Sequence, residues 1–274
     1  MKGWLGALLL LSMLLGGCLV HDERAEELPE IVIGSDSYPP FYYLDEKGEA
    51  AGIDADIARE AFRRMGLRPK FSVIDWKSRH EYLACGHYDC IWGCPAADAR
   101  DGRIWIGPYM KSVLAVAVAA DSDIESLGDL ENRTLAVEAA KGPERILLAH
   151  KDSRIPRVRK IIATDSGDVF FSLLSSGRVD AIAAHREALL QYNKDYGENF
   201  RILGESLAEM HLGVAFRQED SEAAKRLGIV LKEMQQEGMI EEIAAKYLSD
   251  AESYMEGNDH QLGGHHMEED IDGR

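Results

Sequence analysis

The sequence has little positive charge and few cysteines. Its 274 residues include 31 lysines and arginines against 48 aspartates and glutamates, which gives a formal net charge of −17. Proteins bind nucleic acid mainly through lysine and arginine on the phosphates, so this balance argues against nucleic acid as a partner. The hydrophobic share of 46% is ordinary for a globular protein. A chain of this length suits one large domain or two modest ones.

Long apolar runs are missing beyond the N-terminus. Residues 4–15 are largely apolar and follow Lys2. This run is too short to cross a membrane comfortably, but it fits the charged start and apolar middle of a signal peptide. No later stretch is apolar for long enough to span a bilayer.

The end of this run, Leu15-Gly16-Gly17-Cys18, resembles a bacterial lipobox, in which cleavage leaves the cysteine as a lipidated N-terminus. We therefore expect residues 1–18 to be a lipoprotein signal peptide, Cys18 to be the lipidation site and residues 19–29 to be a charged tether. The mature protein is then extracytoplasmic and anchored by lipid to the bacterial cell membrane, at the cell surface or in the periplasm. A plain signal peptide or a short anchor is the alternative.

The other three cysteines are Cys85, Cys90 and Cys94. An extracytoplasmic location permits disulfides, but three cysteines allow at most one bridge within the chain. A disulfide that includes Cys85 is favoured over a metal site built from the three thiolates and His87. Buried, inert thiols are the remaining alternative. We expect neither a metal nor a cofactor.

Residues 31–34, Ile-Val-Ile-Gly, predict a short buried strand with a stop. The prolines at 39–40 cannot continue that strand, because each lacks an N–H group and has a fixed φ. The stiff loop that follows the strand and contains both prolines presents Asp36, Tyr38 and Phe41 just past the carboxyl end of that strand. Ligands bind at this place in open α/β sheets, although the two rings could instead only cover the core.

The next segment predicts an amphipathic helix. Asp54 is a candidate N-cap, four apolar side chains between residues 57 and 65 fall on one face, and Gly66 is a natural stop. Strand, aromatic loop and helix then form one βα unit.

Several motifs in this unit and beyond it match one family. Tyr-x-Pro-Phe at residues 38–41 and Gly-x-Asp-x-Asp-Ile at residues 52–57 resemble the start of the family 3 extracellular solute-binding proteins. These are the amino-acid-type receptors of ABC importers. Gly-Arg-Val-Asp-Ala at residues 177–181 and Ile-x-x-Lys-Tyr at residues 243–247 resemble later parts of the same family. The resemblance covers roughly residues 29–250.

The resemblance implies an α/β fold with the two lobes of a type II periplasmic binding protein, joined by two crossover strands that form the hinge. Lobe 1 would contain residues 30–115 and 208–250, and lobe 2 would contain residues 116–207. Residues 251–274 are acidic, rich in glycine and without periodicity, so we expect a disordered tail. Its histidines make metal scavenging an alternative role.

The resemblance also implies a ligand site between the lobes. The family grips the ligand carboxylate with an arginine, whose guanidinium offers parallel donors. Arg100 is the best candidate here and Arg103 the second. The side chains that we expect to line the cleft are Asp36, Tyr38, Phe41, Trp76, Trp92, Gly93, Arg100 and His185. The aromatic ones would supply an apolar floor and cation–π contacts.

Two positions depart from the family pattern. Amino-acid binders commonly place an aspartate for the ligand's ammonium group where this chain has His185, a weaker and pH-dependent partner. Asp36, Glu187 or a loop carbonyl could substitute. Residues 138–144 stand where the family usually has glycine and a hydroxyl residue, whose backbone N–H groups hold the carboxylate at a helix N-terminus; here the hydroxyl is missing and Lys141 is present. Lys141 could add a cation near an anionic group, but we favour a solvent-facing position.

These observations predict a monomeric, extracytoplasmic solute-binding protein. It would capture a small polar ligand that bears a carboxylate, by default an amino acid or a derivative, and deliver it to an ABC transporter permease. Binding and hinge motion, not catalysis, would be the mechanism. One alternative is a sensing protein that docks on a membrane receptor. The other is a cyclohexadienyl dehydratase-like enzyme on the same fold, with His185 as general acid or base.

Overall fold

The computed structural model describes residues 28–96, 102–165, 167–197 and 200–255. The expected signal peptide with Cys18, most of the expected tether, Arg100 and residues 256–274 lie outside these ranges. Within them, no helix is long and apolar enough to cross a membrane.

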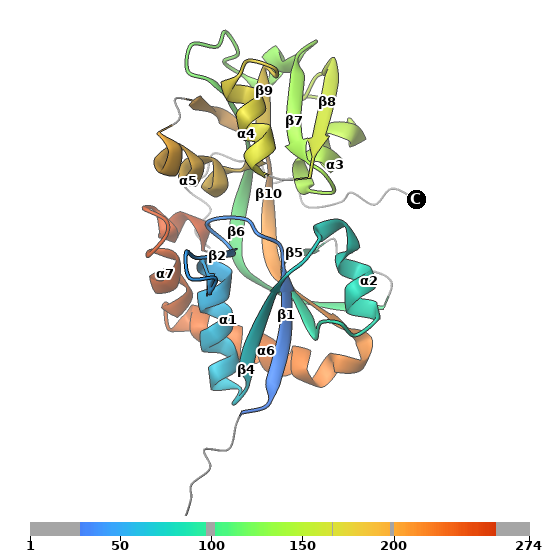
Figure 1. The fold of residues 1–274 in the computed structure, drawn as a ribbon, viewed down its shortest axis with the longest axis vertical. Helices are drawn as coiled ribbons and strands as arrows, with labels where there is room; N and C mark the ends of the chain where they lie inside the picture. Colours follow the sequence, from blue (N-terminus) through green and yellow to red (C-terminus); the bar gives the residue numbers. More distant parts are fainter. Residues whose placement is uncertain (1–27, 97–101, 166, 198–199, 256–274) are drawn as a thin grey trace, which may run out of the picture.

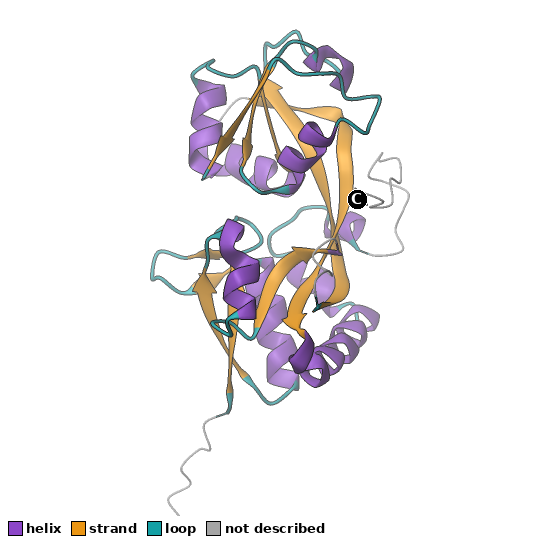
Figure 2. Ribbon diagram, turned by 90° about the vertical axis from the view of Figure 1, so that its right-hand side faces the viewer, coloured by secondary structure: helices purple, strands orange, loops and turns teal. Residues whose placement is uncertain are grey.

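Two groups of strands and helices lie one above the other, joined by the long strands β6 (Arg103–Ala119) and β10 (Phe200–Arg217) (Figures 1 and 2). These two strands pair antiparallel along most of their length. The main strands form a single eight-stranded sheet in the order β4-β1-β5-β10-β6-β9-β7-β8. Because β6 and β10 are continuous through both groups, they are the structural link between them.

The lower group in Figure 1, lobe 1, contains the first strands and the last helices of the chain. In the sheet, β1 lies parallel to β4 and β5. Lobe 1 contains β1 (Glu30–Ser35), β2 (Tyr43–Leu44), β3 (Ala50–Ala51), α1 (Ile53–Arg64), β4 (Arg68–Val73), η1 (Trp76–Ser78), α2 (Arg79–Ala84), β5 (Cys90–Pro95), η4 (Gln218–Asp220), α6 (Ser221–Gln236), α7 (Met239–Ala244) and η5 (Ala251–Tyr254).

The upper group, lobe 2, is formed by the chain between β6 and β10. Its strand β7 lies parallel to both β8 and β9. Lobe 2 contains η3 (Leu127–Leu130), β7 (Thr134–Glu138), α3 (Gly142–Ala149), β8 (Lys160–Thr164), α4 (Gly167–Ser175), β9 (Ala181–His185) and α5 (Arg186–Tyr196).

Each lobe has its own buried core, and the crossover strands pass from one core to the other. Along β6, Met110 belongs to the lobe 1 cluster and Leu114 to a lobe 2 cluster. Along β10, Met210 packs in lobe 2 and Leu212 in lobe 1. Each crossover strand therefore passes from one core to the other a few residues away from the lobe boundaries expected at 115/116 and 207/208.

Local structure departs from the sequence predictions at three places. The helix that contains Asp54 starts two residues earlier than an Asp54 cap requires: Gly52 is the N-cap and Asp54 lies buried inside α1. Residues 251–254 form η5, because the Tyr254 ring packs fully buried in the lobe 1 core, so the tail prediction is wrong for these residues. Residues 256–274 of the tail lie outside the described ranges.

The third place concerns the cysteines, for which the sequence left a disulfide at Cys85 and buried, inert thiols as alternatives. Cys85, Cys90 and Cys94 are free thiols: Cys85 is exposed at the end of α2, whereas the other two are buried in β5. Burial raises the pKa of the Cys90 thiol well above its usual range, as expected of an inert thiol. Among the described residues, no group of three His, Cys, Asp or Glu side chains could hold a metal ion.

Candidate functional site in the cleft between the lobes

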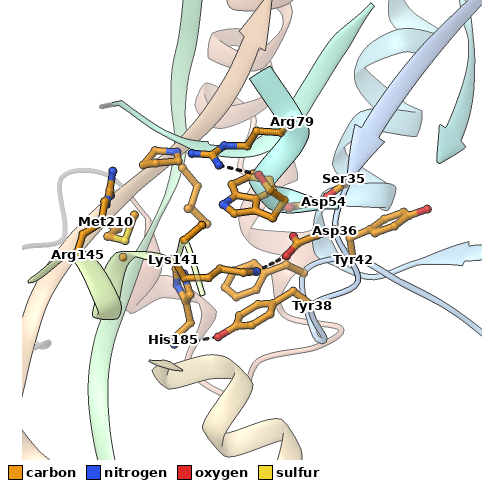
Figure 3. A pocket seen from close by; sticks show the side chains of 17 residues that line it. Ser35, Asp36, Tyr38, Tyr42, Asp54, Arg79, Lys141, Arg145, His185 and Met210 are labelled. Carbon is orange, nitrogen blue, oxygen red and sulfur yellow. Dashed lines mark hydrogen bonds and ion pairs between the residues drawn. The ribbon is translucent and has the colours of Figure 1, made fainter. Parts of the chain in front are cut away.

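A cavity with a volume of about 570 Å³, including open solvent, is lined by side chains from both lobes (Figure 3). Lobe 1 contributes the loop after β1, the segment from η1 to α2 and the end of β5. The start of α3 and the end of β9 contribute from lobe 2. Strand ends and a helix N-terminus thus meet at one place, as the sequence pattern of the first βα unit predicts for one side of the cleft.

Six of the eight residues predicted to line the cleft do line this cavity: Asp36, Tyr38, Phe41, Trp76, Gly93 and His185. Trp92 does not. It is 1% exposed and packs against Phe62 and Tyr109 in the lobe 1 core, with ring centroids 5.9 and 5.7 Å away. Arg100 lies outside the described residues.

The rings of Tyr38 and Phe41 form one wall of the cavity with His185. Tyr38 and Phe41 are stacked at 6.2 Å, and the His185 ring meets both edge-on at 5.4 and 5.5 Å. The backbone N–H of His185 donates to the Tyr38 hydroxyl at 3.3 Å (Figure 3). This contact joins the loop after β1 in lobe 1 to the end of β9 in lobe 2.

Lys141 points into the cleft, so the expected solvent-facing position is wrong. It immediately precedes α3, and its ammonium forms an ion pair with Asp36 across the cleft (Figure 3). The ammonium also lies 3.6 Å from Glu138 Oε2, 4.0 Å from the centroid of the Tyr38 ring and 5.4 Å from that of Trp76. Two carboxylates and two ring faces thus take the place of water around the cation, whose side chain is only 12% exposed.

Two arginines near the cleft were not singled out by the sequence reasoning. The Arg79 guanidinium lies 4.5 Å from the Trp76 ring centroid and donates to the Trp76 carbonyl at 2.7 Å. Arg145 lies on α3, one turn after Lys141, and both arginines line the cavity. Arg79 follows Trp76 by three residues and Arg145 follows Lys141 by four, which is the spacing of neighbours on one helix face. This spacing predicts an arginine in the cleft only when the direction of the helix is known.

Asp54 is a carboxyl group in the cavity wall whose charge is suppressed. Its Oδ1 accepts a hydrogen bond from the Tyr109 hydroxyl at 2.7 Å. Burial raises the pKa of Asp54 to about 7, although the Tyr109 hydrogen bond favours the ionised form. Asp54 is therefore partly neutral near pH 7 and adds only part of a negative charge to the cavity.

His185 continues into a buried polar cluster at the crossover strands. The Ser112 hydroxyl on β6 lies 2.6 Å from His185 Nδ1 and donates to Glu187 Oε2 at 2.8 Å. Burial, and then the nearby charge of Lys141, lower the pKa of His185 to about 3. Burial also raises the pKa of Glu187 to about 8. His185 is therefore neutral over the whole physiological range, and Glu187 does not line the cavity.

The Lys141–Asp36 pair separates the cavity from a broader groove. That groove has a volume of about 1800 Å³, including open solvent, and continues the cleft outward between the lobes. Asp36, Tyr38, Trp76 and Lys141 line both spaces. An aromatic layer with a fixed cation at its centre thus divides the cleft into an inner and an outer part.

Comparisons with known proteins agree on one family. The sequence model of the bacterial extracellular solute-binding proteins, family 3, matches residues 31–250. Over 253 residues the chain is 27% identical to the lysine/arginine/ornithine-binding periplasmic protein of Escherichia coli (strain K12), covering 88% of this chain and 96% of that protein.

Solved structures show the same fold. The substrate binding protein of an amino acid ABC transporter superimposes with a TM-score of 0.71 at 25% identity, covering 80% of this chain and 99% of that one. The protein Tv2483 bound to L-arginine gives a TM-score of 0.72 at 28% identity, covering 80% and 90%. Both the sequence and the fold are thus similar to those of amino-acid-binding proteins over most of the chain.

Proposed function

Because the chain belongs to the bacterial extracellular solute-binding proteins, family 3, we propose that it captures an amino acid or another small carboxylate between its lobes and delivers it to the permease of an ABC importer. The observation that carries this proposal is the cavity where the loop after β1 meets the start of α3. Aromatic rings and positively charged groups line it together, which suits a small organic acid.

The start of α3 is the proposed anchor for the ligand carboxylate. The first turn of a helix has free N–H groups and a partial positive charge. Gly142, at this start, lines the cavity, and an added Cβ would come within 2.8 Å of Leu114 Cδ1 and Met210 Sδ. Arg145 adds a guanidinium one turn further on. Arg100 is proposed as a further, bidentate donor.

An ammonium group on the ligand has fewer partners in the cavity. Asp36 is paired with Lys141, and Asp54 accepts the Tyr109 hydroxyl and has a raised pKa. His185 is neutral and its Nδ1 is bonded to Ser112. We therefore assign most of the affinity to the carboxylate of the ligand.

Closure of the lobes around the ligand is the proposed signal to the permease. The described contacts across the cleft support this mechanism, because they join the lobes without covalent links. They include the ion pairs Lys141–Asp36 and Lys77–Asp165 and the hydrogen bond from His185 to Tyr38. The continuous strands β6 and β10 would bend between Met110 and Leu114 and between Met210 and Leu212, where the core changes.

The proposed location is extracytoplasmic, on a lipid anchor at Cys18 after removal of residues 1–18, with the mature protein acting as a monomer. The residue pattern Leu15-Gly16-Gly17-Cys18 supports this proposal. Growth in labelled palmitate, followed by comparison with Cys18→Ser, tests it: label in the natural protein only is expected, and equal label in both contradicts the anchor.

Binding is proposed in preference to catalysis because of the state of His185. An acid–base catalyst works best when its pKa lies near the working pH. The pKa of His185, about 3, keeps the ring neutral, and its Nδ1 is occupied by the Ser112 hydroxyl. A histidine in this state is a poor general acid at pH 7.

A thermal-shift screen of the refolded protein tests the proposal. Unfolding and refolding first removes any carried ligand, and the panel contains the standard amino acids, polyamines, small carboxylates and chorismate-pathway acids. A ligand at a hundred times its dissociation constant adds about 2.7 kcal/mol, which raises Tm by roughly 5–10 °C for a protein of this size. No shift with any amino acid or carboxylate would contradict the proposal.

A matched pair of arginine variants then places the ligand. Arg145→Gln should weaken binding of the ligand found in the screen about tenfold or more, or roughly 1.4 kcal/mol, because a charged donor is lost. Arg178→Gln, on an exposed turn, should leave the affinity unchanged. Equal affinities in isothermal titration calorimetry for all three proteins would remove Arg145 from the site.

A further inference from the structure

Four side chains from the two lobes surround the Lys141 ammonium, and we call them the cation box: Asp36, Tyr38, Trp76 and Glu138. Asp36 forms an ion pair with it, and Glu138 Oε2 lies at 3.6 Å. The ring centroids of Tyr38 and Trp76 lie at 4.0 and 5.4 Å. Figure 3 shows Lys141 reaching from the start of α3 to Asp36 beside the Tyr38 ring.

The chemistry of the cation box is that of a receptor for an organic cation. Aromatic faces attract a cation through the ring quadrupole, and carboxylates accept charge-assisted hydrogen bonds. The side chains of Asp36 and Glu138 are only 19% and 10% exposed, so water weakens these attractions little. The two carboxylates outnumber the one ammonium, although the Arg79 guanidinium also lies 4.5 Å from the Trp76 ring.

The occupant of this receptor is part of the protein itself. Lys141 is fixed at the start of α3, so its ammonium is always present at the box at a high effective concentration. A free ligand must also give up translational and rotational freedom to bind, which the tethered lysine does not. A displaced Lys141 ammonium would remain close to a cationic ligand and repel it.

We propose that Lys141 is a built-in occupant of the cation box and thereby decides which ligands the cleft accepts. This inference rests on the proposed function and specifies its ligand class. Ligands with an ammonium or guanidinium side chain are rejected, because their position is filled. Small carboxylates whose remaining groups are neutral are accepted, because they do not compete with Lys141 for the cation box.

The ligands of two similar proteins differ from the ligand class that this inference specifies. One similar protein is named for lysine, arginine and ornithine, and one similar structure contains L-arginine. Resemblance to these two relatives alone would favour a cationic amino acid as the ligand of this chain. The contacts of Lys141 point to the opposite class, so the two expectations are separated by one experiment.

The experiment compares the natural protein with Lys141→Ala and Lys141→Met, the second of which keeps much of the apolar stem. Circular dichroism first establishes that each variant is folded. Isothermal titration calorimetry then measures L-arginine, L-lysine, L-glutamine and L-glutamate. We expect the variants to bind arginine or lysine at least about tenfold more tightly than the natural protein does.

A small probe tests the box independently of the natural ligand. Propylammonium chloride resembles the part of the side chain that Lys141→Ala removes. It should raise the Tm of that variant more than sodium chloride of equal ionic strength does, and should not do so for the natural protein. Lys141→Arg, which keeps a cation in the box, and Lys77→Ala, which removes the other lysine across the cleft, are controls that should gain neither effect.

The outcomes separate this inference from the proposed function. Tight binding of arginine or lysine by the natural protein overturns the inference and supports the proposed function. Folded Lys141 variants that gain neither cationic amino acids nor propylammonium stabilisation also overturn it. A propylammonium gain in Lys141→Ala supports the cation box, even if no amino acid or carboxylate in the panel binds the natural protein and the proposed function fails.

Discussion

Among the residues that the structure describes, two lysine–carboxylate pairs cross the cleft, and one of them is shielded from water. In the inner pair, the side chains of Lys141 and Asp36 are 12% and 19% exposed. In the outer pair, those of Lys77 and Asp165 are 48% and 85% exposed. Solvent and salt screen the outer charges, so that pair contributes little, whereas the inner charges are screened much less.

The difference shows how the same two chemical groups acquire different roles. A shielded pair costs desolvation energy and survives only when several partners hold it. Lys141 has such partners in Asp36, Glu138 and two aromatic rings. The inner pair therefore shapes the site, and the outer pair is a contact at the rim.

The largest expected effect comes from a buried acid that has no such pair. Glu187 is fully buried and its pKa is raised to about 8 by burial, while the Ser112 hydroxyl and the charge of Arg186 favour the ionised form only in part. Because the folded pKa lies above the unfolded value, the stabilising effect of this proton is present below about pH 4.5 and is lost as the pH rises toward 8.

Glu187→Gln should remove this loss of stability at rising pH. Between about pH 5 and 7.5, the free energy of unfolding of the natural protein should fall relative to the variant by about 1.4 kcal/mol per pH unit. Urea unfolding at a series of pH values measures it. Two curves that run parallel over this range would show that Glu187 ionises normally in the fold.

A smaller effect is expected from removing one half of the inner pair. Asp36→Ala leaves the Lys141 ammonium with Glu138 alone at 3.6 Å. The free energy of unfolding should drop by about 2–3 kcal/mol, less than for a fully buried pair because Glu138 remains. Urea unfolding at constant pH checks it, with the double variant Asp36→Ala and Lys141→Met as control. A double variant no more stable than the single one would contradict the pairing.

The smallest effect is expected from the outer pair. Lys77→Ala removes a half-exposed lysine whose partner, the Asp165 carboxylate, is surrounded by water. Its urea midpoint should coincide with that of the natural protein, and its affinity for the ligand should be unchanged, because solvent replaces the lost contact. A clear loss of affinity would mean that the rim pair holds the lobes closed and that the contrast between the two pairs is wrong.

Much of the first βα unit could be predicted from the sequence, because its signals are local. The β-branched run before Gly34 and the two prolines at 39–40 define a strand and a stiff loop without reference to the rest of the chain. Tyr38 and His185 also lie in the cleft as expected, because the family motifs locate both.

The rest depended on contacts that the sequence does not encode locally. Trp92 belongs to a strand that is buried almost throughout, so its apolar run gave no sign of which face meets the core. Lys141 and Asp36 are separated by 105 residues and meet only because two lobes face each other. A lone lysine before a helix is ordinarily solvated, which is why solvent was the natural expectation.

The route of the chain through β6 and β10 has an evolutionary consequence. Ser112 pairs with Met210 in the antiparallel register, so lobe 2 leaves and rejoins lobe 1 at neighbouring positions and is in effect one insertion. An insertion with adjoining ends can be exchanged between homologues by two crossovers in the gene. Such an exchange would replace Lys141 and Glu138 while keeping Asp36, Tyr38 and Trp76. Ligand preference could thus pass between homologues in a single recombination event, without point mutation of the recipient half.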